Sequence, residues 1–210
     1  MRAAETTTNR AMGAVETSLP SRAVRAAVSV IGFALLTALF AQVRIPVPGT
    51  VVPLTLQSAA VLLAGFYLSA PLAAAAMVLY VAAGLAGVPV FAPGSLGLAG
   101  ATGGYIVGFV LGAVVVALMR GRSDGIGRLV SAGACGTLVI FACGVLWQVA
   151  FFDISAMAAW TGGVLPFLPK AVVQLGVVVS AVRALGNRRL SGRPSHTILA
   201  GLGGRRDGMK

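Results

Sequence analysis

The chain has 210 residues, of which 58% are hydrophobic and only 10% charged, and sixteen Lys and Arg residues outnumber five acidic ones. A soluble domain carries about 25% charged residues, so this composition excludes an ordinary water-soluble fold and indicates an integral membrane protein. The basic residues lie in short segments between apolar runs, a pattern that indicates membrane topology rather than nucleic-acid binding.

Six apolar segments define the predicted architecture. Each approaches the length of about 20 apolar residues that a transmembrane helix needs. We therefore predict an all-α polytopic membrane protein, with a disordered N-terminal tail at residues 1–21, one six-helix domain at 22–185 and a basic C-terminal tail at 186–210. The predicted spans are Ala23–Val43, Val52–Leu68, Pro71–Val88, Gly103–Met119, Leu129–Ala150 and Val164–Leu185.

Two of these spans are unusual. The second is short, and the sixth begins with two prolines, Pro166 and Pro169. We expect irregular helix ends at both. Irregular backbone is tolerated at membrane depth only where it is buried in protein or lines a cavity.

Positive charge predicts the orientation of the spans. With six crossings, both termini lie on one side, and that side carries all of the basic residues except Arg44 and Lys170. We therefore predict a multi-pass protein of the bacterial plasma membrane with both termini in the cytoplasm. The uncharged loop at 89–101 then faces the outside.

Motifs for covalent chemistry are absent from the sequence. It contains no P-loop, no HExxH, no G-x-S-x-G and no CxxC. The single histidine, His196, lies in the basic tail, and Asp153 is the only acidic residue between Asp124 and Asp207. We therefore expect no enzyme, no metal and no cofactor, and we assign any ATP hydrolysis to partner subunits.

Small residues recur at helical spacing in two spans. Gly104, Gly108 and Gly112 are four residues apart, as are Ala34 and Ala38. Such ladders allow close helix packing in lipid. For the glycines we expect packing inside the protein. For the two alanines, an outward-facing seam that docks a partner membrane protein is the alternative to internal packing.

Polar and aromatic residues gather at the outer ends of the spans. A cation, hydrogen-bonding groups and aromatic rings around a cavity suit a small, partly apolar anion with a polar head. Arg44 and Lys170 have the alternative of reaching the lipid headgroups, and Asp153 that of a solvated loop residue. The candidate substrate-binding residues are Arg44, Thr55, Gln57, Tyr80, Phe91, Tyr105, Asp153, Lys170 and Gln174.

Several sequence runs resemble the BioY family, the biotin-binding membrane subunits (S components) of energy-coupling factor transporters. The resemblance covers roughly residues 25–185 and implies a six-helix bundle with an outward-facing pocket. It also implies a transmembrane coupling protein and two ATPases as partners, with the seam at Ala34 and Ala38 facing the coupling protein. The runs are Ile45-Pro-Val-Pro48, Pro53-Leu-Thr-Leu-Gln57, Gly87-Val-Pro-Val-Phe91 and Thr102-Gly-Gly-Tyr-Ile-Val-Gly-Phe109.

The sixth span departs from the family pattern. The family reads Pro-Phe-Leu-Pro-Gly-Asp-x-x-Lys there, and that Asp and Lys bind the biotin head. This chain has Ala171 at the Asp position and Gln174 at the Lys position, with Lys170 replacing the glycine. Losing a charge-assisted hydrogen bond costs about 1.5–3 kcal/mol. Either Lys170, Gln174 and Asp153 rebuild the site, or the ligand is a relative of biotin.

We therefore expect the chain to capture biotin or a close analogue on the outer side. The ureido-like head is expected near the sixth span. The carboxylate is expected near Thr55 and Gln57, where the N–H groups of a helix N-terminus favour anions. The alternatives are an S component for another vitamin, and a structural or assembly membrane protein with a vestigial pocket.

Overall fold

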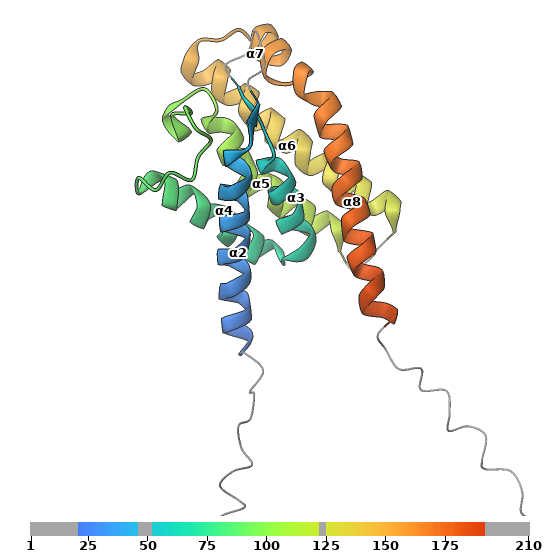
Figure 1. The fold of residues 1–210 in the computed structure, drawn as a ribbon. Helices are drawn as coiled ribbons and strands as arrows, with labels where there is room; N and C mark the ends of the chain where they lie inside the picture. Colours follow the sequence, from blue (N-terminus) through green and yellow to red (C-terminus); the bar gives the residue numbers. More distant parts are fainter. Residues whose placement is uncertain (1–20, 46–51, 122–124, 192–210) are drawn as a thin grey trace, which may run out of the picture.

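The computed structural model describes residues 21–45, 52–121 and 125–191. These residues are mostly helical, which confirms the all-α prediction (Figure 1). The two predicted tails lie mainly outside the described residues. The long elements are α2 (Arg22–Gln42), α3 (Gln57–Tyr67), α4 (Ala70–Leu85), α5 (Gly103–Arg120), α6 (Ile126–Phe152) and α8 (Leu168–Ser191). The short ones are β1 (Arg44–Ile45), β2 (Leu54–Thr55), η1 (Gly97–Ala99), α7 (Ala156–Gly163) and η2 (Leu165–Phe167).

The helices have the length and composition of membrane spans. Within the described residues, four segments are long and apolar enough to cross a bilayer: α2, α5, α6 and the α7–α8 segment at Ala156–Leu185. The helices α3 and α4 are apolar but shorter. The predicted integral membrane character is therefore confirmed, and the six predicted spans correspond to α2, α3, α4, α5, α6 and α8.

The second span starts later than predicted. Residues before Gln57 form β2, which pairs antiparallel with β1 so that Arg44 lies opposite Thr55. Pro53 explains part of the difference, because the residue before a proline is disfavoured in helical conformation. At 11 residues α3 is about 16 Å long, only half of the roughly 30 Å hydrocarbon core.

The sixth span has an irregular start, as its prolines predict. The short helix α7 is followed by η2, which contains Pro166, and α8 then begins at Leu168. At its other end α8 continues to Ser191, so the predicted domain boundary at residue 185 falls inside a helix. The start of α2 and the end of α8 lie at the same end of the bundle, and α7 lies at the opposite end (Figure 1).

The glycine ladder of α5 packs directly on α6, so the predicted internal packing is confirmed. A Cβ atom on Gly104 would overlap the Trp147 side chain and the Cys143 carbonyl group. A Cβ on Gly108 would lie 2.9 Å from the Cα atom of Ile140. These glycines let the two backbones approach without an intervening layer of side chains.

The alanine seam of α2 does not face outward, and that prediction is wrong. Ala34 is only 7% exposed and belongs to the same buried cluster as Ala73, Ala76 and Met77 of α4. Ala38 is partly buried against this cluster. The small side chains of both helices favour this internal contact, because they allow close packing. The outward stripe of α2 consists instead of Val24, Val28, Ile31, Leu35 and Leu39, which are 50–65% exposed.

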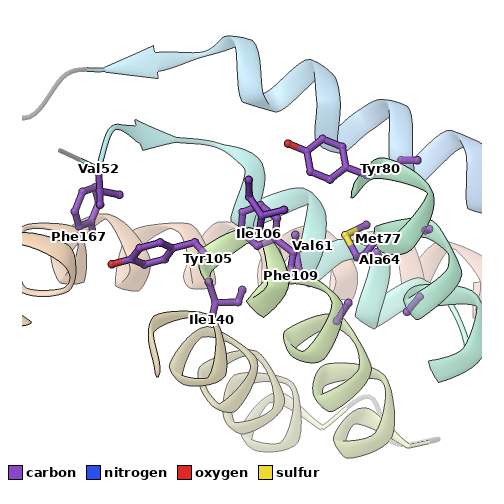
Figure 2. Packing of buried hydrophobic residues seen from close by; sticks show 14 residues of the cluster. Val52, Val61, Ala64, Met77, Tyr80, Tyr105, Ile106, Phe109, Ile140 and Phe167 are labelled. Atoms are coloured by element: carbon purple, nitrogen blue, oxygen red, sulfur yellow. The ribbon is translucent and has the colours of Figure 1, made fainter. Parts of the chain in front are cut away.

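The core lies between α3, α4 and α5. Figure 2 shows Val61 of α3 beside Ile106 and Phe109 of α5. At one end of this cluster, Tyr105 extends toward Phe167 in η2. The core therefore continues toward the end of the bundle where α7 and the polar residues of α3 and α8 are found.

Substituting Gly104 with alanine should destabilise the bundle. The new methyl group has to displace backbone atoms of α6, and such overpacking costs about 1–3 kcal/mol. We expect a lower melting temperature for detergent-purified Gly104→Ala. The control is Gly176→Ala in α8, where a Cβ meets no described atom within 4 Å. Equal melting temperatures for the two variants would contradict the close contact of α5 with α6.

Candidate functional site

A cavity lies among α3, α5, α6 and α8, under β2 and the loop at 89–101. The space that it encloses, with its open mouth included, is about 800 Å³. Its apolar wall includes Ile106, Phe109, Ile140, Phe141 and Phe167. Its polar lining comprises Thr55, Gln57, Ser58, Ser95, Thr102, Tyr105, Thr137, Lys170 and Gln174.

Five of the nine predicted site residues line this cavity. They are Thr55, Gln57, Tyr105, Lys170 and Gln174, and they come from β2, α3, α5 and α8. The fold thus brings together residues up to 119 positions apart in the chain, from Thr55 to Gln174. That these residues bind a ligand stays a prediction.

A hydrogen-bonded cluster joins α8 to the start of α3. Lys170 Nζ donates to Ser58 Oγ at 2.8 Å, and Ser58 Oγ lies 3.2 Å from Oε1 and 3.0 Å from Nε2 of Gln174. Among the described residues that line the cavity, Lys170 is the only charged one. Ser58 was missed by the sequence analysis. The sequence feature that could have identified Ser58 is its place directly after Gln57, at the polar start of an otherwise apolar segment.

A second chain of hydrogen bonds fixes Gln57. Thr55 Oγ1 donates to Gln57 Oε1 at 2.9 Å, and Gln57 Nε2 donates to the Tyr80 hydroxyl group at 2.6 Å. Gln57 is 6% exposed and Tyr80 is 1% exposed. Tyr80 does not line the cavity. Its hydroxyl group instead fixes the position of the Gln57 amide. Because both side chains are buried, losing this hydrogen bond would be costly.

Arg44 and Phe91 hold the loop at 89–101 rather than line the cavity. Arg44 Nη1 donates to the Pro93 carbonyl oxygen at 2.7 Å, which joins β1 to the loop. The Phe91 ring meets Tyr80 edge-on, with centroids 5.5 Å apart, and lies against Gly84 and Gly97. A side chain at either glycine would overlap this ring. The loop itself supplies Ala92 and Ser95 to the cavity lining.

Asp153 lies away from the cavity. It is the exposed residue that ends α6, in left-handed conformation with φ of 50°. It is also the only acidic residue that the structure describes. The described lining of the cavity therefore has a cation and no carboxylate.

The C-terminal end of α6 carries residues that the candidate set did not include. Trp147 Nε1 donates to the Gly100 carbonyl oxygen at 3.2 Å, and Gln148 Nε2 donates to that of Ala101 at 3.4 Å. Gln148 is only 2% exposed. A lone amide within an apolar span was its sequence signal, because buried polar groups in membranes need partners. These bonds fix the end of the loop that covers the cavity.

The fold defines a class of membrane protein. It matches the crystal structure of the S-component for biotin from an ECF-type ABC transporter, with a TM-score of 0.70 over 80% of this chain and 94% of that one. The two sequences are 19% identical, so this likeness establishes the fold alone. The chain has an S-component fold.

Sequence comparison then gives the family. The BioY family matches residues 8–191, so the chain belongs to the BioY family. The probable biotin transporter BioY of Pyrococcus horikoshii is 36% identical over 159 residues, covering 74% of this chain and 93% of that protein. The biotin transporter BioY of Thermotoga maritima is 34% identical over 149 residues, covering 70% of this chain and 86% of that protein. The resemblance inferred from the sequence is confirmed.

Removing the Tyr80 hydroxyl group should destabilise the site. The variant Tyr80→Phe leaves the Nε2 atom of the buried Gln57 without its hydrogen-bond acceptor, at a cost of about 1–3 kcal/mol. We expect a lower melting temperature in detergent. The control is Tyr67→Phe, because Tyr67 is 37% exposed and loses no buried contact of this kind. A Tyr80→Phe protein as stable as Tyr67→Phe would show that this bond does not stabilise the fold.

Proposed function

We propose that the chain is the substrate-binding membrane subunit for uptake of biotin, and that the cavity binds the vitamin. Membership of the BioY family and the two relatives named as biotin transporters support this proposal. The observation that carries it is the cavity itself: a largely apolar space with one cation and several neutral hydrogen-bonding groups in its described lining.

The chemistry of biotin suits this lining. Biotin combines a carboxylate, an aliphatic chain and a fused-ring head with a neutral urea group. The chain and rings match the wall of Phe109, Ile140 and Phe167, where their burial is favourable by about 25 cal/mol per Å². The urea and carboxylate groups match the hydroxyl, amide and ammonium groups of the polar lining.

The pocket opens on the outer side, and both termini lie in the cytoplasm. The distribution of Lys and Arg supports this orientation, as does the position of the α2 start and the α8 end at one end of the bundle. The cavity lies toward the opposite end, under the loop at 89–101.

Partner subunits drive translocation by hydrolysing ATP. The solved S component of similar fold comes from an ECF-type ABC transporter, and the sequence has no P-loop of its own. A transmembrane coupling protein is therefore the expected immediate partner. With Ala34 buried, the exposed apolar stripe of α2 is the surface available for it.

A biotin relative, or another vitamin, is the second candidate ligand. The observation that favours it is Ala171, which lines the cavity at the position where the family pattern has an acidic residue. A ligand that lacks the hydrogen-bond donors for this acidic group would lose less than biotin from the replacement. Binding measurements separate the two.

Filling the cavity should weaken biotin binding. We expect radiolabelled biotin to bind the purified protein. It should bind the Ala171→Leu variant at least about tenfold more weakly, because the larger side chain occupies part of the cavity. The control is Val172→Leu, at a neighbouring position that is 70% exposed. Equal binding by Ala171→Leu would show that biotin does not use this cavity. Binding of another vitamin in place of biotin would favour the second candidate.

Cysteine labelling tests the orientation. In a variant with Cys135 and Cys143 replaced by alanine, we expect Leu96→Cys to react with a membrane-impermeant maleimide on intact cells, because Leu96 is 76% exposed in the outer loop. Ile126→Cys, at the start of α6 and 56% exposed, should react only after permeabilisation. The reverse labelling pattern would contradict the outward-facing pocket.

A further inference from the structure

The corner where Lys170 meets the start of α3 has no counter-charge from the residues that the structure describes. We propose that this corner, formed by Lys170, Ser58 and Gln174, binds the carboxylate of the ligand, and that the site therefore selects the free acid over its uncharged esters and amides. This inference rests on the proposed function and adds to it the orientation of the ligand and the group that decides its specificity.

The charge balance is the first support. Lys170 is the only charged residue of the described lining, and Asp153, the only described acidic residue, is exposed outside the cavity. A charge in a membrane interior is costly unless it is paired. The carboxylate of a bound ligand supplies the missing negative charge.

The geometry is the second support. Lys170 Nζ and Ser58 Oγ are 2.8 Å apart, so one carboxylate group can reach both of them. The ammonium group has further N–H donors for it, and the Ser58 hydroxyl can rotate from Gln174 Oε1 to donate to it as well. Gln174 lies within hydrogen-bond distance of the same serine through its amide group and holds it from the other side. Ser58 is in the first turn of α3, whose N-cap residue Leu56 makes no side-chain hydrogen bond. The partial positive charge of this helix N-terminus adds to the positive field of Lys170.

The rest of the polar lining suits a neutral group. Apart from Lys170, the polar lining consists of groups such as the hydroxyls of Thr102 and Thr137, which carry no charge. A urea group is neutral and needs only such partners, whereas a carboxylate gains most from a cation. Charge therefore orients the ligand with its carboxylate at Lys170. This orientation reverses the expectation that the head lies near the sixth span.

Competition binding with uncharged analogues tests the proposal. On the purified full-length protein, radiolabelled biotin is displaced by unlabelled biotin, biotin methyl ester or biotin amide. We expect the ester and the amide to bind about 10- to 100-fold more weakly than the acid, as the loss of one charge-assisted interaction implies. In Lys170→Met, the affinity for biotin should fall by a similar factor. The preference for the acid over the ester and the amide should fall to less than about threefold. Lys170→Arg keeps the charge and should keep the preference.

The outcomes separate this inference from the proposed function. If the wild-type protein binds the ester and the amide as tightly as biotin, biotin binding stands and the carboxylate assignment is overturned. A Lys170→Met variant that still prefers the acid overturns it as well. If the wild-type protein binds no biotin, the proposed function fails and this inference fails with it. The comparison of analogues on the wild-type protein needs no variant, so a poorly folded Lys170→Met leaves the test intact.

Arg44→Gln provides a matched control. Arg44 is the other basic residue on the predicted outer side, and its guanidinium group contacts Pro93 rather than the cavity. Its loss removes the same charge from the same end of the protein. The ratio of acid to amide affinity should stay as in the wild type. If Arg44→Gln lowers this ratio as much as Lys170→Met does, the preference for the acid depends on the overall positive charge at this end of the protein. The assignment to Lys170 is then overturned.

Discussion

Polar groups inside a membrane need partners, and this constraint organises the half of the protein that contains the cavity. The amide of Gln57 is held by Thr55 and Tyr80, and the Tyr105 hydroxyl group donates to the Gly163 carbonyl oxygen at 2.8 Å. Each of these bonds satisfies neutral groups within the protein. Lys170 differs, because Ser58 accepts one of its hydrogen bonds but does not compensate its charge. In the proposed orientation, the carboxylate of the ligand supplies that compensation.

The helix α5 connects this site to the rest of the bundle. One face carries Gly104 and Gly108 and packs against the backbone of α6. Another carries Ile106 and Phe109, which form part of the cavity wall. The close packing on the first face fixes the position of the second. The cavity thus has a rigid wall, although α3 on its other side is short and begins in an irregular segment.

The sequence predicted the membrane fold and much of the cavity. Composition identified the six helices, and the prolines at 166 and 169 located the break before α8. The polar starts of the second and sixth spans placed Thr55, Gln57, Lys170 and Gln174 among the candidates. In apolar helices these few polar residues are informative, because lipid offers them no hydrogen bonds.

The direction of individual side chains was harder to predict. A helix that is apolar on all sides lacks the periodicity that distinguishes a buried face from an exposed one, so the burial of Ala34 was not evident. The positions of Arg44 and Phe91 depend on the pairing of β1 with β2 and on the path of the loop. The residues around Asp153 did not reveal that α6 ends there, or that the Asp153 side chain lies outside the cavity.

A structure of the purified full-length chain determined with biotin tests the central claim most directly. The account predicts biotin in the cavity between α3, α5, α6 and α8, with a carboxylate oxygen about 3 Å from Lys170 Nζ. Biotin bound outside this cavity, or bound in it with the urea group at Lys170, would contradict the account.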